Sequence, residues 1–528
     1  MSSNRRPVYT ADCETDPFKE NRIPYPFIWG LFDGDNYNEF TDTDDFVDFV
    51  SKIPCIVYAH NGGKFDWFYI LHRFHQFEPM MVINGRIASF KIGEAEFRDS
   101  YNILPIPLAA YQKDEIDYAI FEKSERKKPH NWKAIRHYLY KDCVYLHELV
   151  SRFVNEYGVK LTLASAALSE WRKMTGVKTP NTSASFYESI APYYYGGRTQ
   201  CFTPGIFEKD FKVIDINSAY PTAMKSLHPY GAKYSISSKL PKTDKFITRC
   251  FITLECISHG ALPFRGANGL EFPDDDERRI YHVTGWEYLA GLRTNTIGNI
   301  KIIKVLQFKE SISFDDYIDR FYKMKSQAKA ANDHAGYIFA KLFLNSLYGK
   351  FGSNPEKYRE YMVVNPHYIE AAEQDGYNYH ALINKWALVS KPLAPEKQRY
   401  YNVAVSASIT GFVRAFLWES ICKCEGVMYC DTDSIVCEST GNLEIDPHTL
   451  GAWDVEAECD YAAIGGKKLY AFHDKTGKWK TATKGVRLTH DDIIKVCKGQ
   501  TVTHTPENPS YSIVNGIRFI SRNIKQTA

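Results

Sequence analysis

The sequence lacks the features that mark membrane and secreted proteins. No stretch reaches the run of about 18 consecutive apolar residues that a membrane-spanning helix requires. Residues 1–16 turn acidic at once instead of leading into an apolar segment, which argues against an export signal. The 12 cysteines in 528 residues do not follow the pattern of a small disulfide scaffold. These absences predict a soluble protein with reduced thiols and no membrane partner.

An excess of charge of one sign is absent as well. Lys and Arg number 65 against 63 Asp and Glu, so the formal net charge of +2 dictates no partner. Local basic patches are still compatible with this balance. The one cysteine cluster worth testing for zinc lacks a two-knuckle spacing, so we expect no zinc at Cys422, Cys424, Cys430 and Cys437.

Apolar and aromatic residues are plentiful. Apolar residues make up 44% of the chain, enough to build the cores of three or four domains at about 150 residues each. Phe, Trp and Tyr reach 15%, which suffices for stacking surfaces as well as cores. The composition predicts a large multidomain globular protein and argues against disorder.

Strand and helix patterns alternate along the first 160 residues. Apolar runs predict strands at 6–12 and 56–60, and longer periodic runs predict helices at 66–77 and 132–157. This alternation indicates an α/β layer that ends near residue 160. Further along, we expect helix 161–175, strand 212–216, an αα-hairpin at 313–348, helix 406–423 and a β-hairpin at 427–438.

Two carboxylates stand in the turn of the expected β-hairpin. Apolar residues flank the polar segment with Asp431, Thr432 and Asp433, as in a tight turn. For the turn alone an alternative stays open, because Asp and Thr also favour turns by hydrogen-bonding their own backbone. Asp215, however, ends another apolar strand. Acids at the ends of two strands can hold a pair of divalent cations, which clamp the attacking and leaving oxygens of a phosphoryl transfer.

One face of the second helix of the αα-hairpin carries three polar side chains. Lys341, Asn345 and Tyr348 are spaced i, i+4 and i+7, so they share this face before Gly349 ends the helix. An exposed amphipathic helix can show the same spacing by accident. If the metal-binding acids lie nearby, Lys341 would bind the phosphates of a nucleotide whose base and sugar lie along Asn345 and Tyr348.

A second acidic set lies in the first 142 residues. Asp12 and Glu14 close the first strand, Asp66 opens a helix, and Tyr138 precedes Asp142 by one helical turn. Each acid alone is better explained as a solvated side chain or a helix cap. Together, the four carboxylates suit a second two-metal centre for phosphodiester hydrolysis, with the Tyr138 hydroxyl placed to orient an attacking water.

Read in order, these segments resemble the motifs of family B DNA polymerases, specifically the protein-primed branch of phages, linear plasmids and related viruses. The resemblance runs from residue 12 to about 485. The amino-terminal segments match the exonuclease motifs, although Tyr101 stands where the family has Leu. The matching residues are Asp12 and Glu14 in the first motif, Tyr58, His60, Asn61, Phe65 and Asp66 in the second, Tyr138 and Asp142 in the third, Ser100 and Leu104 in the single-strand-binding motif, and Lys113 and Ile116 in the motif with a catalytic lysine.

The later segments resemble the polymerase motifs, with Ala219 before Tyr220 where the family usually has Leu. The matching residues are Tyr194, Gly196 and Gly197 in the linker motif, Asp215, Ser218, Tyr220 and Pro221 in the first polymerase motif, Lys341, Asn345, Ser346, Tyr348 and Gly349 in the second, Tyr429, Asp431, Thr432, Asp433 and Ser434 in the third, and Lys468 and Tyr470 in the duplex-binding motif.

The resemblance implies an α/β and α+β multidomain fold, with an RNase H-like 3′–5′ exonuclease domain and a right-hand polymerase of palm, fingers and thumb with two insertions. In the family, the first insertion contacts the terminal protein, and the second helps to encircle DNA for processivity and strand displacement. The implied domains are exonuclease 1–158, palm 159–226 and 401–485, first insertion 227–312, fingers 313–352, second insertion 353–400 and thumb 486–528.

The resemblance also implies roles for the residues. Asp215 and Asp433, with the Ile216 carbonyl and support from Asp431, would bind two Mg²⁺ ions, which Mn²⁺ can replace because oxygen ligands suit both. Tyr220 and Tyr348 would pack on the incoming nucleotide, Tyr220 excluding a ribose 2′-hydroxyl. Two further ions would lie at Asp12, Glu14, Asp66 and Asp142. The implied DNA contacts are Thr15, Tyr58, His60, Asn61, Phe65, Ser100, Tyr194, Gly196, Gly197, Thr432, Lys468 and Tyr470.

The implied function is DNA-directed DNA synthesis with 3′–5′ proofreading, replicating a linear genome in a host cytoplasm by protein-primed, strand-displacing synthesis. Substrates would be template-primer DNA and deoxynucleoside triphosphates. A terminal protein is the expected partner, with a single-stranded DNA-binding protein as a further candidate. The alternative, a replication or packaging factor with nuclease activity only, is disfavoured by the acids at 215, 431 and 433 together with Lys341. A first insertion that merely stabilises the fold is the alternative to a docking surface.

Overall fold

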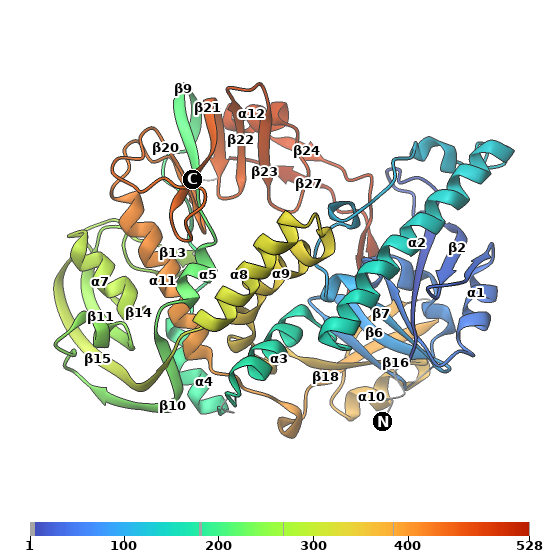
Figure 1. Ribbon diagram of the computed structural model, residues 1–528, viewed down its shortest axis with the longest axis horizontal. Helices are drawn as coiled ribbons and strands as arrows, with labels where there is room; N and C mark the ends of the chain where they lie inside the picture. Colours follow the sequence, from blue (N-terminus) through green and yellow to red (C-terminus); the bar gives the residue numbers. More distant parts are fainter. Residues whose placement is uncertain (1–5, 76, 179–181, 268, 384, 527–528) are drawn as a thin grey trace.

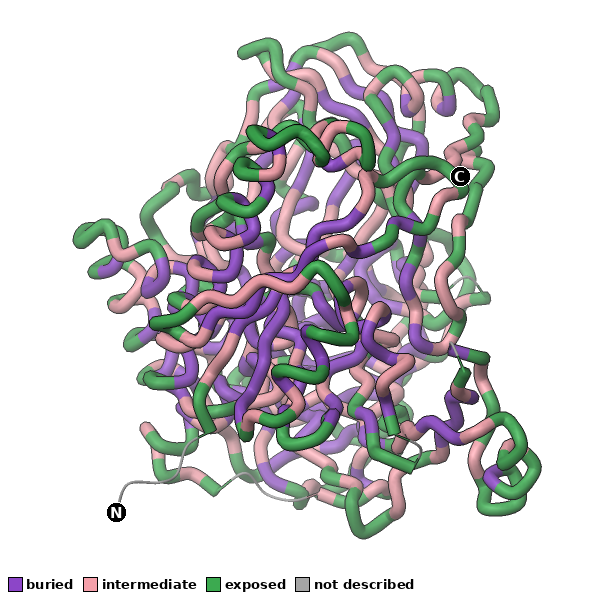
Figure 2. The backbone as a smooth tube through the Cα atoms, turned by 90° about the vertical axis from the view of Figure 1, so that its right-hand side faces the viewer, coloured by how far each residue is buried: buried purple, intermediate pink, exposed green. Residues whose placement is uncertain are grey.

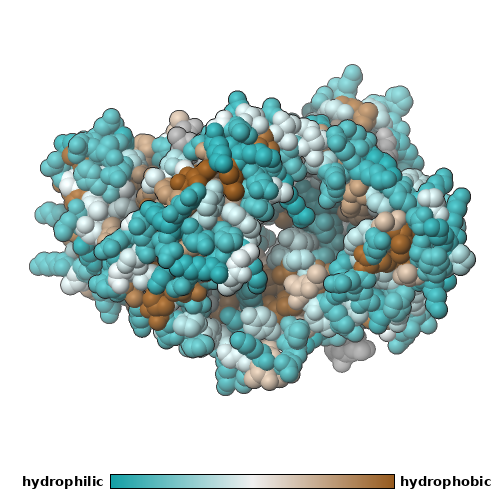
Figure 3. All heavy atoms as spheres, turned by 90° about the horizontal axis from the view of Figure 1, so that it is seen from above, coloured by the Kyte–Doolittle hydropathy of each residue, from teal (hydrophilic) through white to brown (hydrophobic). Residues whose placement is uncertain are grey.

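The computed structural model describes residues 6–75, 77–178, 182–267, 269–383 and 385–526. The amino-terminal region, blue in Figure 1, lies at one side, and the yellow helices α8 and α9 stand between it and the carboxy-terminal strands. Buried segments run through the middle of the molecule, whereas many of the outer loops are exposed (Figure 2). Seen from above, the surface is hollowed near its centre (Figure 3). No helix in the described ranges is long and apolar enough to span a bilayer.

A ten-stranded sheet forms the amino-terminal region, in the order β17-β18-β16-β5-β6-β7-β4-β1-β2-β3. It includes β3 (Tyr37–Phe40), β6 (Arg86–Ile92) and β7 (Ala95–Asp99). Strand β1 (Val8–Thr15) pairs antiparallel with β2 (Pro26–Phe32) and parallel with β4 (Ile56–Ala59). Helix α2 (Pro129–Tyr157) packs on β1 and β2. It begins at a proline, whose fixed φ suits the first turn, and ends before Gly158 at φ 80°. The predicted strands at 6–12 and 56–60 and the helix at 132–157 are confirmed, with ends shifted by a few residues.

The α-helix predicted at 66–77 is wrong. The segment forms two short 3₁₀ turns, η2 (Asp66–Tyr69) and η3 (Leu71–Arg73), and Gln76 lies outside the described residues. Its apolar spacing suits a helical face, but half of its residues are aromatic or β-branched, which have low helix propensity. Their burial rewards i+3 backbone bonds instead, and the buried side chains are Trp67, Phe68, Ile70, Leu71 and Phe74.

The other predicted elements are confirmed with shifted ends. The αα-hairpin turns at Asn332, which adopts φ 53°, a left-handed conformation that Asn tolerates. The observed elements are α3 (Leu163–Thr175), β9 (Gly205–Ile216), α8 (Asp315–Ala330), α9 (His334–Phe351), α11 (Val403–Ile421), β19 (Tyr429–Asp431) and β20 (Ser434–Cys437).

A seven-stranded sheet forms the second layer, in the order β23-β22-β21-β9-β20-β19-β8, with β8 at Thr199–Cys201. Strand β9 is much longer than predicted because β21 (Trp453–Gly466) pairs along its whole length and satisfies its backbone groups. Helix α11 is buried along almost its entire length and packs against α5 (Ala219–Met224), α7 (Gly285–Arg293) and α9.

The two predicted insertions contain sheets. Residues 227–312 form a four-stranded sheet, β10-β15-β11-β14, whose strands are β10 (His228–Ser237), β11 (Cys250–Ser258), β14 (Arg279–Thr284) and β15 (Ile297–Ile312). Residues 353–400 contain β16 (Arg359–Val364), β17 (Asn378–Ile383) and β18 (Trp386–Pro392). Because β16 pairs with β5 (Pro79–Ile83), the second insertion is hydrogen-bonded into the amino-terminal sheet.

The carboxy-terminal region continues from β22 (Leu469–Asp474) and β23 (Trp479–Thr483) into α12 (His490–Cys497). Strand β24 (Val502–His504) pairs with β27 (Arg522–Ile524). Residues 505–521 between these two strands form what we call the carboxy-terminal arm. It contains the hairpin β25 (Ser510–Ser512) and β26 (Gly516–Arg518).

Candidate active sites

The hairpin acidic cluster consists of Asp215, Asp431 and Asp433. Asp215 ends β9, and Ser434 lies opposite it in the β-ladder. The backbone N–H of Ile216 donates to the Asp433 carbonyl at 2.8 Å. The turn closes tightly, with Thr432 at φ 61° and the Asp433 N–H donating to the Asp431 carbonyl at 2.6 Å. The strands therefore carry the three predicted acids to one edge of the sheet.

The cluster holds more negative charge than its surroundings balance. Burial and the neighbouring Asp433 and Glu456 raise the pKa of Asp215 to about 7. Burial and Asp431 likewise raise the pKa of Asp433. Glu456 lies on β21, which pairs with β9, and the sequence analysis missed it because nothing in the sequence reveals that pairing. The raised pKa values mean that a cation at this edge would be stabilised.

Asp431 differs from the other two acids because it has partners. The Thr199 hydroxyl donates to its Oδ1 at 2.8 Å, and Lys468 Nζ lies 2.9 Å from its Oδ2. The Lys468 N–H also donates to the Tyr429 hydroxyl at 2.9 Å, and the Tyr470 ring lies 5.1 Å from the Tyr429 ring. The structure thus brings the predicted duplex-binding residues Lys468 and Tyr470 to the base of the hairpin.

Two predicted nucleotide contacts stack on each other. The Tyr220 and Tyr348 rings lie parallel, 4.4 Å between centroids. Burial raises the pKa of both hydroxyls, and Asp433 adds to each shift, so the pair lies within electrostatic range of the acids. Lys341 and Asn345 lie farther along the same face of α9, exposed, beside a cavity of about 670 Å³ that α8, α9 and the 105–110 loop enclose.

The linker motif is held against the hairpin. A Cβ on Gly197 would lie 2.8 Å from Thr432 Oγ1, so only glycine allows this approach. Arg414 Nη1 donates to the carbonyls of Tyr195 and Gly196 at 2.8 and 2.6 Å. Arg414 is 2% exposed and pairs with buried Glu287 of the first insertion at 2.7 Å. The sequence analysis missed Arg414, although a lone cation inside an otherwise apolar helix was a usable signal.

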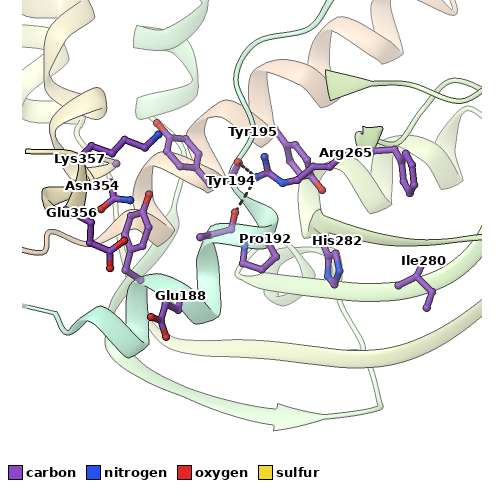
Figure 4. Close-up of a pocket in the computed structure, with 14 residues that line it drawn as sticks. Glu188, Pro192, Tyr194, Tyr195, Arg265, Ile280, His282, Asn354, Glu356 and Lys357 are labelled. Carbon is purple, nitrogen blue, oxygen red and sulfur yellow. Dashed lines mark hydrogen bonds between the residues drawn. The ribbon is translucent and has the colours of Figure 1, made fainter. Parts of the chain in front are cut away.

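A second arginine holds the other side of the linker. Arg265 Nη2 donates to the Tyr194 and Ala191 carbonyls at 2.6 and 3.1 Å, and its guanidinium lies 4.5 Å from the Tyr195 ring centroid. Figure 4 shows these groups at a cavity of about 1030 Å³, with Lys357 also on its wall. The first insertion therefore reaches the linker at two points, through Glu287 and Arg265.

The amino-terminal acidic cluster consists of Asp12, Glu14, Asp66 and Asp142. Burial raises the pKa of Glu14 to about 8 and that of Asp66 to about 6. Burial, then Asp66 and Glu14, raise the pKa of Asp12 well above its usual range, and burial raises that of Asp142. The backbone N–H of Cys13 donates to Asp66 Oδ1 at 3.3 Å. Three segments distant in sequence thus bring four acids to one buried site.

Lys113 and Tyr138 lie at the edge of this cluster. Lys113 Nζ forms an ion pair with Asp142 Oδ2 at 3.3 Å and lies 5.3 Å from the Tyr138 ring centroid. The Tyr138 hydroxyl is 2.9 Å from that of Tyr118. Both predicted residues therefore join the acids, with Tyr118 as a neighbour that the sequence analysis did not identify.

The donor sets of both clusters fit divalent cations. Glu14 Oε1 and Asp142 Oδ1 are buried without a hydrogen-bond partner, an arrangement that is costly unless a cation satisfies them. Within the described residues, no three His, Cys, Asp or Glu side chains already converge as metal ligands.

The predicted strand-binding residues separate into exposed and supporting groups. His60 bonds Ser100 Oγ at 3.0 Å and the Ile106 carbonyl at 2.8 Å, and Asn61 accepts from Arg86 at 2.6 Å. Ser100 is fully buried. Two further residues, Tyr58 and Thr15, are buried at 1% and 8% exposure, and their contact with DNA stays a prediction. Strand β4 turns Tyr58 into the core, and the Thr15 hydroxyl donates to the Asp16 carbonyl.

An α/β sheet with one acidic cluster, joined to a second sheet with another, is an arrangement that fits the class of DNA polymerases. Comparison with known proteins agrees. The structure superposes on phi29 DNA polymerase in complex with primer-template DNA and incoming nucleotides with a TM-score of 0.76 at 19% identity, covering 99% of this chain and 100% of the other.

Sequence comparison identifies the family. The model of DNA polymerase type B, organellar and viral, matches residues 105–415. The DNA-directed DNA polymerase of Enterobacteria phage PRD1 is 37% identical over 98% of both chains. The DNA polymerase of Bacillus phage phi29 is 24% identical over 89% of this chain and 87% of its own. The chain therefore belongs to the organellar and viral type B DNA polymerases and is a DNA-directed DNA polymerase of phage type.

Proposed function

We propose that the hairpin cluster catalyses transfer of a deoxynucleotide to a primer 3′-hydroxyl on template-primer DNA. The observation that carries this proposal is that Asp215 and Asp433 stand at one sheet edge with raised pKa values and, among the described residues, without an ion pair of their own. Asp215, Asp433 and the Ile216 carbonyl would hold two Mg²⁺ ions. When bound, these ions would activate the primer hydroxyl and neutralise charge on the leaving pyrophosphate.

The chain's own residues would position the reactants. Lys341 would bind the triphosphate after α9 moves toward the palm, because in this structure it faces the cavity beside the 105–110 loop. Tyr220, stacked on Tyr348, would form the floor under the incoming sugar. Asp431 forms an ion pair with Lys468 and would support the hairpin beside the two metal-binding acids.

We propose that the amino-terminal cluster is a 3′–5′ exonuclease site. Its support is the pair of buried oxygens without partners, on Glu14 and Asp142, together with Lys113 at the cluster edge. Asp12, Glu14, Asp66 and Asp142 would hold Mg²⁺, which would supply an activated water. Tyr138 would orient that water, and Phe65, His60 and Asn61 would hold the 3′ end.

The domain division proposed is exonuclease 1–158, palm 159–226 and 401–485, first insertion 227–312, fingers 313–352, second insertion 353–400 and thumb 486–528. The first insertion would dock a terminal protein and the second would help to enclose DNA. Supporting observations are the separate four-stranded sheet of the first insertion and the pairing of β16 with β5. We further propose protein-primed, strand-displacing replication in a host cytoplasm, with a single-stranded DNA-binding protein as an accessory partner.

Primer extension tests the polymerase proposal against the alternative of a nuclease alone. The full chain with Mg²⁺, template-primer and labelled deoxynucleotides should extend the primer, whereas a nuclease would only shorten it. Priming is tested separately, with the candidate terminal protein, origin DNA and one labelled deoxynucleotide. Label covalently attached to that protein supports priming. Its absence, while the enzyme extends an ordinary primer, refutes priming alone.

A further inference from the structure

The carboxy-terminal arm leaves the thumb and lies against the exonuclease domain. It starts after β24 and returns at β27, and these two strands pair with each other. Between them, Tyr511 and Ile513 enter the core of the amino-terminal region, where they are 5% and 0% exposed. Figure 1 shows dark-red chain reaching the blue region. The arm therefore links thumb and exonuclease domain through buried side chains.

Tyr511 packs beside the exonuclease acid Asp66. Its ring lies edge-to-face against Phe65 at 5.2 Å and against Phe68 at 5.3 Å between centroids. Burial raises the pKa of Tyr511 to about 12, and the charge of Asp66 contributes to the shift. Tyr511 is therefore a neutral hydroxyl within electrostatic range of a proposed metal ligand, although it lies about 445 positions later in the chain.

The hydroxyl of Tyr511 has a defined hydrogen-bond direction. Tyr69 donates its single hydroxyl proton to the Pro24 carbonyl at 2.8 Å, so it accepts from Tyr511, whose hydroxyl is also 2.8 Å away. Pro24 belongs to the loop that carries Phe18, whose ring lies 5.6 Å from that of Phe65. Tyr511 thus contacts Phe65 directly. Through Tyr69 it also holds the loop that places the Phe18 ring next to Phe65.

The outer edge of this aromatic group is open. Phe65 is half-buried, and on the neighbouring loop Phe18, Ile23 and Tyr25 are 39%, 51% and 70% exposed. Exposed rings next to a nuclease site are surfaces on which the bases of a single strand can stack, whatever their sequence. The acids would act on the phosphodiester, while these rings would hold the bases.

We propose that Tyr511 is a positioning residue for the exonuclease, holding Phe65 and the 18–25 loop so that the terminal bases of a single DNA strand can stack on them. The inference rests on the exonuclease activity proposed above. Tyr511 acts through Phe65 and Tyr69 and contacts neither acid nor strand. Because the arm belongs to the thumb, the 3′-end site is complete only while the arm is docked.

The test measures degradation of a 5′-labelled single-stranded oligonucleotide by the full chain with Mg²⁺. Tyr511→Ala should raise KM about tenfold and change kcat less than about twofold, because it weakens stacking and leaves the acids intact. Tyr511→Phe should raise KM about threefold by removing one hydrogen bond. The pair Tyr69→Phe and Tyr511→Phe should be non-additive, since each removes the same bond. Primer extension should stay at the parental rate.

Ser510→Ala, a change at an exposed neighbour in the arm, is the matched control and should leave KM unchanged. A parental KM in folded Tyr511→Ala overturns the proposal, as does an equal loss of nuclease and primer extension, which indicates a general folding defect. If Tyr511→Ala does not fold, the KM of Tyr511→Phe decides. A parent that shows no more nuclease activity than Asp12→Ala with Asp66→Ala would refute the exonuclease itself, and this inference with it.

Discussion

The hairpin acidic cluster and the amino-terminal acidic cluster have similar side chains but differ in their exposure to solvent. Each has one acid beside a lysine, Asp431 with Lys468 at 2.9 Å and Asp142 with Lys113 at 3.3 Å. The hairpin acids are only partly buried, whereas Glu14 and Asp66 are buried at 8% and 2% exposure. Unpaired buried oxygens among the cluster acids occur, within the described residues, only in the amino-terminal cluster.

This difference in burial agrees with the substrates that each proposed site would have to bind. The proposed polymerase site would have to accept a nucleotide, a primer and a template, and its acids lie partly exposed where β9 meets the 431–433 turn. A site that acts on one strand end can enclose its acids, and enclosure raises their pKa values and makes a cation more necessary. We expect the two centres to be separable by mutation and to differ in sensitivity to pH.

The largest expected effect is loss of synthesis alone. Asp215→Asn or Asp433→Asn should reduce primer extension by more than about a thousandfold, because each removes a charge that would hold the cations. Degradation of single-stranded DNA should stay within about twofold of the parental rate. Both rates are measured on the same preparations, with thermal unfolding as the folding control. Comparable loss of both activities in folded protein would contradict two independent centres.

Mutation of the amino-terminal acidic cluster tests whether DNA degradation can be lost while DNA synthesis is retained. Asp12→Ala with Asp66→Ala should reduce 3′-end degradation at least about a hundredfold and leave primer extension unchanged, since Asp12 lies in a different sheet and Asp66 accepts a hydrogen bond from Cys13 of the same strand. Release of label from a 3′-labelled oligonucleotide is the measurement. Digestion at the parental rate would remove the exonuclease assignment.

A smaller effect is expected on the selection between ribonucleotides and deoxynucleotides. Tyr220→Val should raise the ratio of ribonucleotide to deoxynucleotide incorporation by about tenfold or more, because it removes the ring stacked on Tyr348 and opens space for a 2′-hydroxyl. Only the ratio is informative, since loss of the ring can slow both substrates. Competition between the two nucleotides during single-step extension measures it. An unchanged ratio would show that Tyr220 does not select the sugar.

The sequence predicted local motifs better than it predicted their supports. Asp215 and the 431–433 turn were predictable because apolar strands frame them, and β9, β19 and β20 form as expected. Arg414, Glu287 and Glu456 were missed because their roles depend on pairing between segments distant in sequence.

The helix predicted at 66–77 failed for a related reason. Its spacing suited a helix, but tertiary burial of bulky aromatic side chains favoured 3₁₀ turns. The position of the carboxy-terminal arm could not be predicted from the sequence, because nothing within residues 505–521 indicates the distant core that Tyr511 enters.

The smallest expected effect is a pH dependence of stability in metal-free protein. Burial raises the pKa of Glu14 from its usual value to about 8, so the folded state binds this proton more tightly than the unfolded state. Folded protein is therefore destabilised progressively as pH rises from about 4.5 through 8. In EDTA, the unfolding temperature of the parent should fall between pH 6 and pH 8.5 by a few degrees more than that of Glu14→Gln.

Two controls complete this measurement. Glu94→Gln, at an exposed position, should keep the parental pH dependence. Mg²⁺ should reduce the difference between parent and Glu14→Gln, because a cation stabilises the ionised carboxylate that burial opposes. If Glu14→Gln and the parent lose stability equally over this range, Glu14 does not take up a proton on folding. The contrast between an enclosed and an open acidic centre would then have to rest on Asp12, Asp66 and Asp142 alone.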